Sequence, residues 1–160
     1  MGKIVFGTEG WRAVMAEEFT VENVRLVSQA IAEHVREHAA SSKGSLTMAV
    51  GYDTRFLSDR FAAAVCEVLA GNGIRTVLAD RSVPTCAVSR YVLAHRLAAG
   101  IVITASHNPP EYNGLKVKEA YGGSATSETV ASIEERIGAH PIKQLTLEQA
   151  DEQRLTSRAN

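Results

Sequence analysis

The segment Thr104–Pro110 carries the side chains of this chain that are best suited to chemistry. It places Ser106 beside His107 and Asn108, directly after an apolar run, and Lys116 follows within about ten residues. A phosphorylated serine bears about −1.5 to −2 charge and needs cations and N–H donors around it. The segment therefore suits a hydroxyl that carries a phosphoryl group. The alternative, a serine loop capped by prolines and without a function, fits these residues about equally well.

Other kinds of serine chemistry are disfavoured by the neighbours of Ser106. The nucleophile elbow of α/β-hydrolases needs glycine two positions before and after the serine, where this chain has Thr104 and Asn108. A Ser-His-Asp triad needs a histidine from a distant segment, oriented by a buried carboxylate. His107 is adjacent in sequence, and adjacent side chains usually point apart, so it is a poor base for Ser106.

Two further segments place charged residues in possible ligand-binding loops. In Phe6–Arg12, Gly7 and Gly10 let the backbone approach a ligand closely, and the guanidinium of Arg12 could bind a phosphate with two N–H groups. Most turns of this kind have no function, and a plain turn is the simpler interpretation. Gly51–Arg55 ends a predicted strand with an acidic and a basic residue. Its spacing alone favours a local salt bridge and the entry of a helix.

The stretch His34–His38 fits the H-x-x-E-H pattern of a zinc peptidase family. Its two histidines would share one helix face. The pattern is short, and no later helix offers a convincing third carboxylate ligand, so a solvated helix end is the favoured interpretation. Cys66 and Cys86 lie outside any metal-ligand spacing and at apolar helix positions, which predicts that both belong to the core.

Strands and helices alternate along the chain and must position these segments. Apolar spacing predicts helices over about residues 20–38, 61–70, 84–96 and 127–137, and strands over 3–6, 46–52, 74–79, 100–104 and 115–117. This order predicts an α/β fold of three layers, α/β/α, with a mixed, largely parallel sheet whose ligands lie beyond the carboxyl ends of the strands. From residue 139 the sequence becomes polar. We therefore predict a domain over 1–138 and a linker, or the truncated start of another domain, over 139–160.

The composition is that of one ordinary globular domain. The 160 residues are 45% hydrophobic, and 17 basic against 18 acidic side chains leave a net charge of −1. This balance gives no overall attraction to nucleic acid or to an acidic membrane, so anion binding needs a local cluster. The apolar runs are far shorter than the ~20 residues of a membrane span. With two cysteines and no signal peptide, the sequence predicts a reduced, cytoplasmic protein.

Four motifs, in this order, resemble those of the α-D-phosphohexomutases, the family that includes phosphoglucomutase and phosphomannomutase. The motifs are Phe6–Arg12, Gly51–Arg55, Thr104–Pro109 and Tyr112–Lys116. The resemblance covers about residues 4–138 and points to the first of the four domains of the family enzymes. It implies that Ser106 is the phosphorylated residue. The serine would exchange its phosphoryl group with a hexose phosphate through a bisphosphorylated sugar, so that a 1-phosphate becomes a 6-phosphate or the reverse.

The resemblance also implies roles for the residues around Ser106. Lys116 and Arg12 would stabilise the charge that develops on the transferring group and assist proton transfer, and His107 would assist in the same pocket. Thr8, Gly10 and Asn108 would bind the substrate or its phosphate. Ala13 stands where the family usually has glycine, which is a mild change if the backbone keeps a negative φ.

The cofactors that the resemblance implies are Mg²⁺, bound in part through the phosphate on Ser106, and a glucose 1,6-bisphosphate type of activator. In the family the other metal ligands come from an Asp-Gly-Asp-x-Asp-Arg loop in the second domain, and this motif is absent here. The expected partners are a hexose phosphate and the remaining domains of a full-length enzyme, with no nucleic acid and no membrane. We expect the 160 residues alone not to interconvert hexose phosphates.

The substrate stays open at this point. Phosphoglucosamine mutases usually carry an acidic residue before Asn-Gly, whereas Tyr112 stands directly before Asn113 here, and this slightly favours glucose or mannose phosphates. Two alternatives remain: a phosphoglucosamine mutase domain, and a non-catalytic module that binds a sugar phosphate or another protein.

Overall fold

The main helices follow the apolar stripes of the sequence. The computed structural model describes residues 4–7, 10–39 and 46–160. The helices that the sequence predicts are α1 (Val21–Ala39), α2 (Ser58–Gly71), α3 (Thr85–His95) and α4 (Ser127–Arg136). Thr20 caps α1, since its Oγ1 accepts a hydrogen bond from the Asn23 amide at 3.2 Å. After α2, Gly73 adopts a left-handed φ of 74°, which ends the helix where the sequence predicts.

The strands form one mixed sheet with the order β1-β5-β4-β2-β3-β6. They are β1 (Trp11–Val14), β2 (Thr47–Tyr52), β3 (Arg75–Ala79), β4 (Ala99–Ile103), β5 (Tyr112–Glu119) and β6 (Thr156–Ala159). Strands β4, β2, β3 and β6 run parallel, whereas β5 is antiparallel to its neighbours β4 and β1. The predicted α/β class with a mixed, largely parallel sheet is confirmed.

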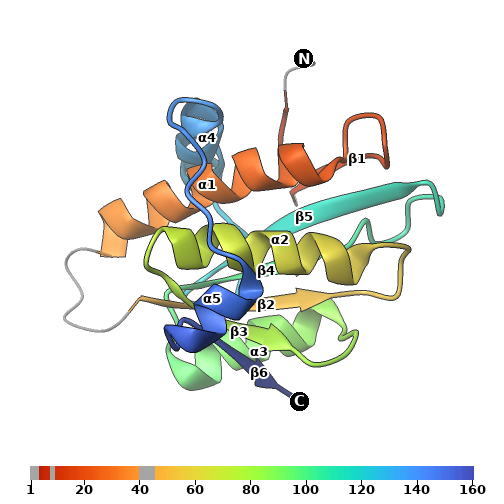
Figure 1. Cartoon of the computed structure of the whole chain (residues 1–160). Coiled ribbons are helices and arrows are strands. Elements are labelled where there is room, and N and C mark those ends of the chain that lie inside the picture. Colours follow the sequence, from red (N-terminus) through yellow and green to blue (C-terminus); the bar gives the residue numbers. More distant parts are fainter. Residues whose placement is uncertain (1–3, 8–9, 40–45) are drawn as a thin grey trace.

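Helices cover both faces of this sheet and complete the three layers. Helices α1, α2 and α4 lie on one face and α3 on the other (Figure 1). The larger core lies under α1 and α2, with Phe19, Ile31 and Leu69 fully buried. A smaller core of Ala49, Val88, Val92 and Val102 lies under α3. Among the described residues, no helix is both long and apolar enough to cross a membrane.

The first strand lies later in the chain than the sequence predicts. Residues 4–6, expected as part of a strand over 3–6, form none, and residue 3 lies outside the described residues. The strand begins at Trp11, after a bridge between Gly7 and Gly10. Trp11 and Ala13 are buried and alternate with less buried residues. This period of two extends over only four residues and includes Arg12, so it gives little signal in the sequence.

The polar segment after Gly138 contains two elements that the sequence did not predict, α5 (Leu147–Glu152) and β6. Helix α5 begins with a capping box between Thr146 and Gln149. Strand β6 pairs in parallel with β3 and thus lies in the same sheet as the rest of the chain. Of the residues of α5, Ala150 is the buried one, which explains why no apolar stripe is visible. The domain boundary near residue 138 stays a prediction.

The two cysteines differ from each other in burial. Cys66 lies in the large core as predicted, and burial raises the pKa of its thiol to about 12. Cys86 was predicted to lie in the core as well, but it is exposed in the first turn of α3. The prediction for Cys86 is wrong because α3 directs only Val88 and Val92 fully into the sheet and leaves the rest of its surface to solvent.

The stretch His34–His38, which matches the H-x-x-E-H pattern, lies at the contact between α1 and α4. His34 Nδ1 is 2.8 Å from Ser132 Oγ, and the rings of His34 and His38 stack with centroids 4.1 Å apart. The sequence predicts a solvated helix end here. His38 is exposed as expected, whereas His34 is half-buried. Within the described parts of the chain, no three His, Cys, Asp or Glu residues are arranged to hold a metal ion.

Stability should fall at acid pH because of His34. Burial, with help from His38 and Arg136, lowers the pKa of its imidazole below the usual value in unfolded chains. The unfolded state therefore binds more protons between the two pKa values, and the free energy of unfolding decreases as the pH falls below about 6.5. Urea unfolding between pH 5 and 8 should show this slope, and His34→Gln should flatten it. Equal slopes for the two proteins would contradict the assignment.

Candidate active site around Ser106

Ser106 lies in the loop that follows β4, at the carboxyl end of the parallel strands. Its side chain is exposed, and its backbone takes a left-handed φ of 54°. This region is unfavourable for residues other than glycine, and it occurs where the surroundings fix the backbone. Two local hydrogen bonds contribute: the Ser106 amide donates to Thr104 Oγ1 at 3.0 Å, and the Asn108 amide donates to the Ala105 carbonyl at 3.1 Å. The strained turn directs the hydroxyl to the surface.

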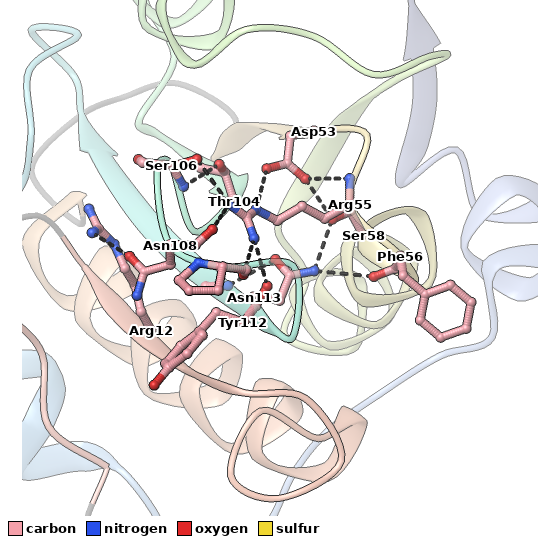
Figure 2. A network of polar contacts seen from close by, with 12 residues as sticks. Arg12, Asp53, Arg55, Phe56, Ser58, Thr104, Ser106, Asn108, Tyr112 and Asn113 are labelled. Carbon is pink, nitrogen blue, oxygen red and sulfur yellow. Dashed lines mark hydrogen bonds and ion pairs between the residues drawn. The ribbon is translucent and has the colours of Figure 1, made fainter.

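The guanidinium of Arg55 lies in the centre of this loop (Figure 2). Its Nη2 donates to the carbonyl oxygens of Ser106 at 2.9 Å and Asn108 at 2.6 Å. Its Nη1 donates to the carbonyl oxygens of Pro109 at 2.8 Å and Tyr112 at 3.1 Å. A side chain from the connection between β2 and α2 thus holds the loop that follows β4, and β4 is the neighbour of β2 in the sheet.

A chain of polar contacts links Arg55 to the start of β5. Asp53 forms an ion pair with Arg55, with Oδ2 3.4 Å from Nε, and its Oδ1 accepts the hydroxyl hydrogen of Ser58 at 2.8 Å. The buried Asn113 donates from Nδ2 to Ser58 Oγ at 2.9 Å and accepts the Gly114 amide at 2.8 Å. The ends of β2, α2 and β5 are therefore connected through buried or partly buried groups.

Arg12 and Lys116 lie on the same face of the sheet. Arg12 of β1 is opposite Gly114 of β5, and Lys116 follows two positions later along β5, where side chains return to the same face. The Nη1 group of Arg12 donates to Asn108 Oδ1 at 3.0 Å, next to Ser106 (Figure 2). Lys116 is 7% exposed and pairs with Val102 of β4. Strands β1 and β5 thus bring two cations to the part of the sheet from which the serine loop leaves.

The other residues that the sequence places in the site are described by their exposure and backbone conformation. His107 is exposed beside Ser106. Gly10 has φ of 126°, and a Cβ there would lie 2.4 Å from the Leu115 carbonyl oxygen, so the backbone at this point needs glycine. Thr8 lies outside the described residues. Ala13 keeps a negative φ, which is the condition under which alanine at this position is expected to be a mild change.

Comparison with known proteins decides the family. Residues 3–141 match the α/β/α domain I of the phosphoglucomutase/phosphomannomutase family. The chain belongs to this family. As a phosphohexomutase domain I, it has the fold and the order of motifs that the sequence analysis expects.

Its relatives include enzymes named for different sugars. A phosphoglucomutase from Staphylococcus saprophyticus is 33% identical over 86% of this chain and 25% of that protein. A phosphoglucosamine mutase from Thermotoga sp. strain RQ2 is 39% identical over 82% of this chain and 28% of that protein. The crystal structure of a protein from Thermus thermophilus, assigned as a phosphomannomutase, has a TM-score of 0.80 and 40% identity, and covers 90% of this chain and 31% of that one. The chain thus spans about a quarter of the length of the curated relatives.

In this phosphohexomutase domain, the contacts of Arg55 to the serine loop are not visible in the sequence. The local salt bridge to Asp53 and the entry of α2 are both present, as the spacing of Gly51–Arg55 suggests. The spacing does not show the four carbonyl groups on the serine loop, because backbone carbonyls have no signature in a sequence. The one feature of the sequence that indicates a role for Arg55 at the site is its position just after the carboxyl end of a predicted strand, and that strand, β2, lies next to β4.

Proposed function

We propose that this domain carries the phosphoryl group of a hexose phosphate mutase on Ser106. The observation that carries the proposal is the exposed hydroxyl of Ser106 on a strained loop that Arg55 holds, with Arg12 reaching Asn108 beside it. The names of the relatives support a phosphomutase reaction. The proposed substrates are glucose and mannose phosphates, and the full reaction converts a 1-phosphate to a 6-phosphate or the reverse.

The proposed reaction has two phosphoryl transfers. In the first, a sugar hydroxyl oxygen forms a bond to the phosphorus of phosphorylated Ser106 and gives its proton to a base, while the bond from phosphorus to Ser106 Oγ breaks and Oγ takes up a proton from an acid. The bisphosphorylated sugar then turns over in the site. In the second, Ser106 Oγ attacks the other phosphoryl group and gives its proton to a base, the bond from that phosphorus to the sugar oxygen breaks, and the sugar oxygen takes up a proton as the sugar leaves with one phosphate. Atoms and charge balance over the two steps.

The chain's own residues would serve these transfers mainly by positioning and by charge. Phosphoryl transfer needs cations around the equatorial oxygens more than it needs covalent chemistry. Arg12 and Lys116 are proposed to stabilise that charge and assist the proton, and His107 to assist beside Ser106. Asn108, Gly10 and Thr8 are proposed to contact the phosphate or the sugar.

Mg²⁺, when bound, would neutralise charge on the transferring group. The described residues fit only part of such a site, because they hold no cluster of three carboxylate, histidine or cysteine ligands. From this chain, a phosphorylated Ser106 would contribute one phosphate oxygen to the metal. The other ligands, and the contacts to the rest of the sugar, are proposed to come from further domains of a full-length enzyme, which are the expected partners.

Glucosamine phosphate is the second candidate substrate. The relative from Thermotoga, with 39% identity, is named for that sugar. Against it, Tyr112 directly precedes Asn113 in the loop before β5, where the glucosamine enzymes usually have an acidic residue. We therefore place glucose or mannose first.

Intact-mass spectrometry tests the proposal. After incubation with glucose 1,6-bisphosphate and Mg²⁺, the protein should gain the mass of one phosphate, mapped to Ser106, and Ser106→Ala should lose this gain completely. Ser82→Ala, at an exposed serine after β3, is the matched control and should be phosphorylated like the wild type. A chain that never takes up phosphate at Ser106 would favour the non-catalytic, sugar-phosphate-binding module.

A further inference from the structure

Both terminal nitrogens of the Arg55 guanidinium are engaged within the chain. A guanidinium has five N–H donors. The two on Nη1 and the two on Nη2 face the carbonyl oxygens of Pro109, Tyr112, Ser106 and Asn108, and Nε faces Asp53 Oδ2. Four hydrogen bonds from the two terminal nitrogens therefore end on the backbone of one loop, and Nε lies beside the carboxylate of Asp53 in an ion pair.

The position of the guanidinium also argues for a role inside the loop. The Arg55 side chain is 15% exposed, and Asp53 holds it from the opposite side, through the ion pair and through the Arg55 amide, which donates to Asp53 Oδ1 at 3.0 Å. Ser58 fixes the same carboxylate from α2. Arg55 is thus anchored to β2 and α2, whereas its partners lie 51 to 57 positions further along the chain.

We propose that Arg55 is the positioning residue of the phosphoryl-carrying loop: it draws the loop carbonyls inward, holds Ser106 in its left-handed conformation with the hydroxyl outward, and does not itself bind the phosphate. The proposal rests on the proposed function for what Ser106 carries, but the loop geometry is independent of it. A lysine cannot replace Arg55, because an ammonium is a compact charge with three donors and lacks the planar fork.

Hydrogen exchange of single amides measures this role. The Asn108 and Tyr112 amides close turns inside the loop, on the carbonyls of Ala105 and Pro109, whereas the Ala98 amide bonds to Thr47 elsewhere in the sheet. In Arg55→Lys, the two loop amides should exchange at least about tenfold faster, because local opening is no longer opposed by the guanidinium, while the Ala98 amide keeps its rate. Arg60→Lys, at an exposed arginine of α2, is the matched control and should exchange like the wild type.

Chemical rescue separates a specific guanidinium from general support of the fold. In Arg55→Ala, methylguanidinium should slow the exchange of the Asn108 and Tyr112 amides, and methylammonium at the same ionic strength should not. The proposal would be overturned if both salts slowed amide exchange equally, or if neither salt slowed it. If Arg55→Lys destabilises the whole domain, so that the Ala98 amide also exchanges faster, the comparison of methylguanidinium with methylammonium in Arg55→Ala still tests the proposal.

Phosphorylation separates positioning from phosphate binding. In the full chain made with phosphoserine at position 106, the Asn108 and Tyr112 amides should stay as protected as in the unmodified protein. If Arg55 bound the phosphate, its guanidinium would leave the carbonyls and both amides would exchange at least about tenfold faster, which would overturn the proposal. These measurements use no sugar phosphate. Failure of Ser106 to accept phosphate from glucose 1,6-bisphosphate would therefore count against the proposed function alone.

Discussion

Phe19→Ala should lower the free energy of unfolding by about 3–5 kcal/mol. Phe19 is fully buried in the large core, where its ring contacts β1 and α2. Its ring stacks on Trp11 of β1 with centroids 4.6 Å apart and meets the edge of Phe61 of α2 at 4.8 Å. The substitution removes the apolar contacts, leaves a cavity, and breaks two aromatic pairs at once.

Urea and thermal unfolding measure the effect of Phe19→Ala. A domain of this size is stable by about 5–15 kcal/mol, so the loss is a large share of the total, and the Tm should fall by roughly 6–20 °C. Phe56→Ala removes the same atoms from a ring that is 73% exposed and points away from the polar network (Figure 2). It should change stability by less than about 0.5 kcal/mol. A similar loss of unfolding free energy in both variants would show that the contacts of Phe19 with Trp11 and Phe61 do not stabilise the core.

Much of the fold is predictable because its signals are local. The stripe of Phe61, Val65 and Val68 lies on one helix whatever the rest of the chain does, and all three side chains are buried in α2. The apolar run of β4 is buried at every position, as a strand covered on both faces should be. The serine loop could therefore be placed correctly at the carboxyl end of that strand.

The edges of the sheet could not be predicted in the same way. Strands β1 and β6 have four residues each and pair on one side, so few of their side chains need to be apolar. In β6, the burial of Ser157 and Arg158 is low, and the strand is defined by its backbone pairing with β3. Backbone hydrogen bonds between distant segments leave no periodic pattern in a sequence.

The candidate site shows the same division between side-chain and backbone information. Ser106, Asn108 and Arg12 could be proposed from residue type and motif, and the structure joins Arg12 to Asn108. The contribution of Arg55 could not, because it bonds to carbonyl groups, which every residue has. The turn at Ser106 is likewise a property of the loop as a whole.

Gly114→Ala should disturb the fold and the site together. Gly114 lies in β5 between β1 and β4, and a Cβ there would lie 2.6 Å from the Thr104 carbonyl oxygen and 2.8 Å from that of Trp11. Both contacts are with backbone, so neither neighbour can turn away and a strand must shift. The expected cost is about 3 kcal/mol, at the upper end of the range for overpacking. Urea unfolding measures it, and Gly7→Ala is the control, because the nearest atom there is 3.6 Å away.

The shift should also reach Ser106. Gly114 is paired with Arg12, its carbonyl accepts the Thr104 amide at 2.9 Å, and Thr104 in turn holds the Ser106 amide. Moving β1 or β4 away from β5 would separate the guanidinium of Arg12 from Asn108 and loosen the base of the serine loop. The rate of phosphate uptake at Ser106 should therefore fall by about tenfold or more, because displacing a charged group or a nucleophile by about 1 Å lowers a reaction rate by this much or more.

Phe19→Ala and Gly114→Ala together separate stability from geometry. Both variants should lose about 3 kcal/mol or more, but Phe19 packs under α2, on the face of the sheet opposite to Arg12, and its ring partners lie outside the serine loop network. At a temperature where both variants are folded, Phe19→Ala should take up phosphate at the wild-type rate and Gly114→Ala should not. Equal uptake in the two variants would mean that the close approach of three strands at Gly114 serves the fold alone. A loss in Gly114→Ala only would show that this approach also sets the place of Arg12 beside the phosphoryl carrier.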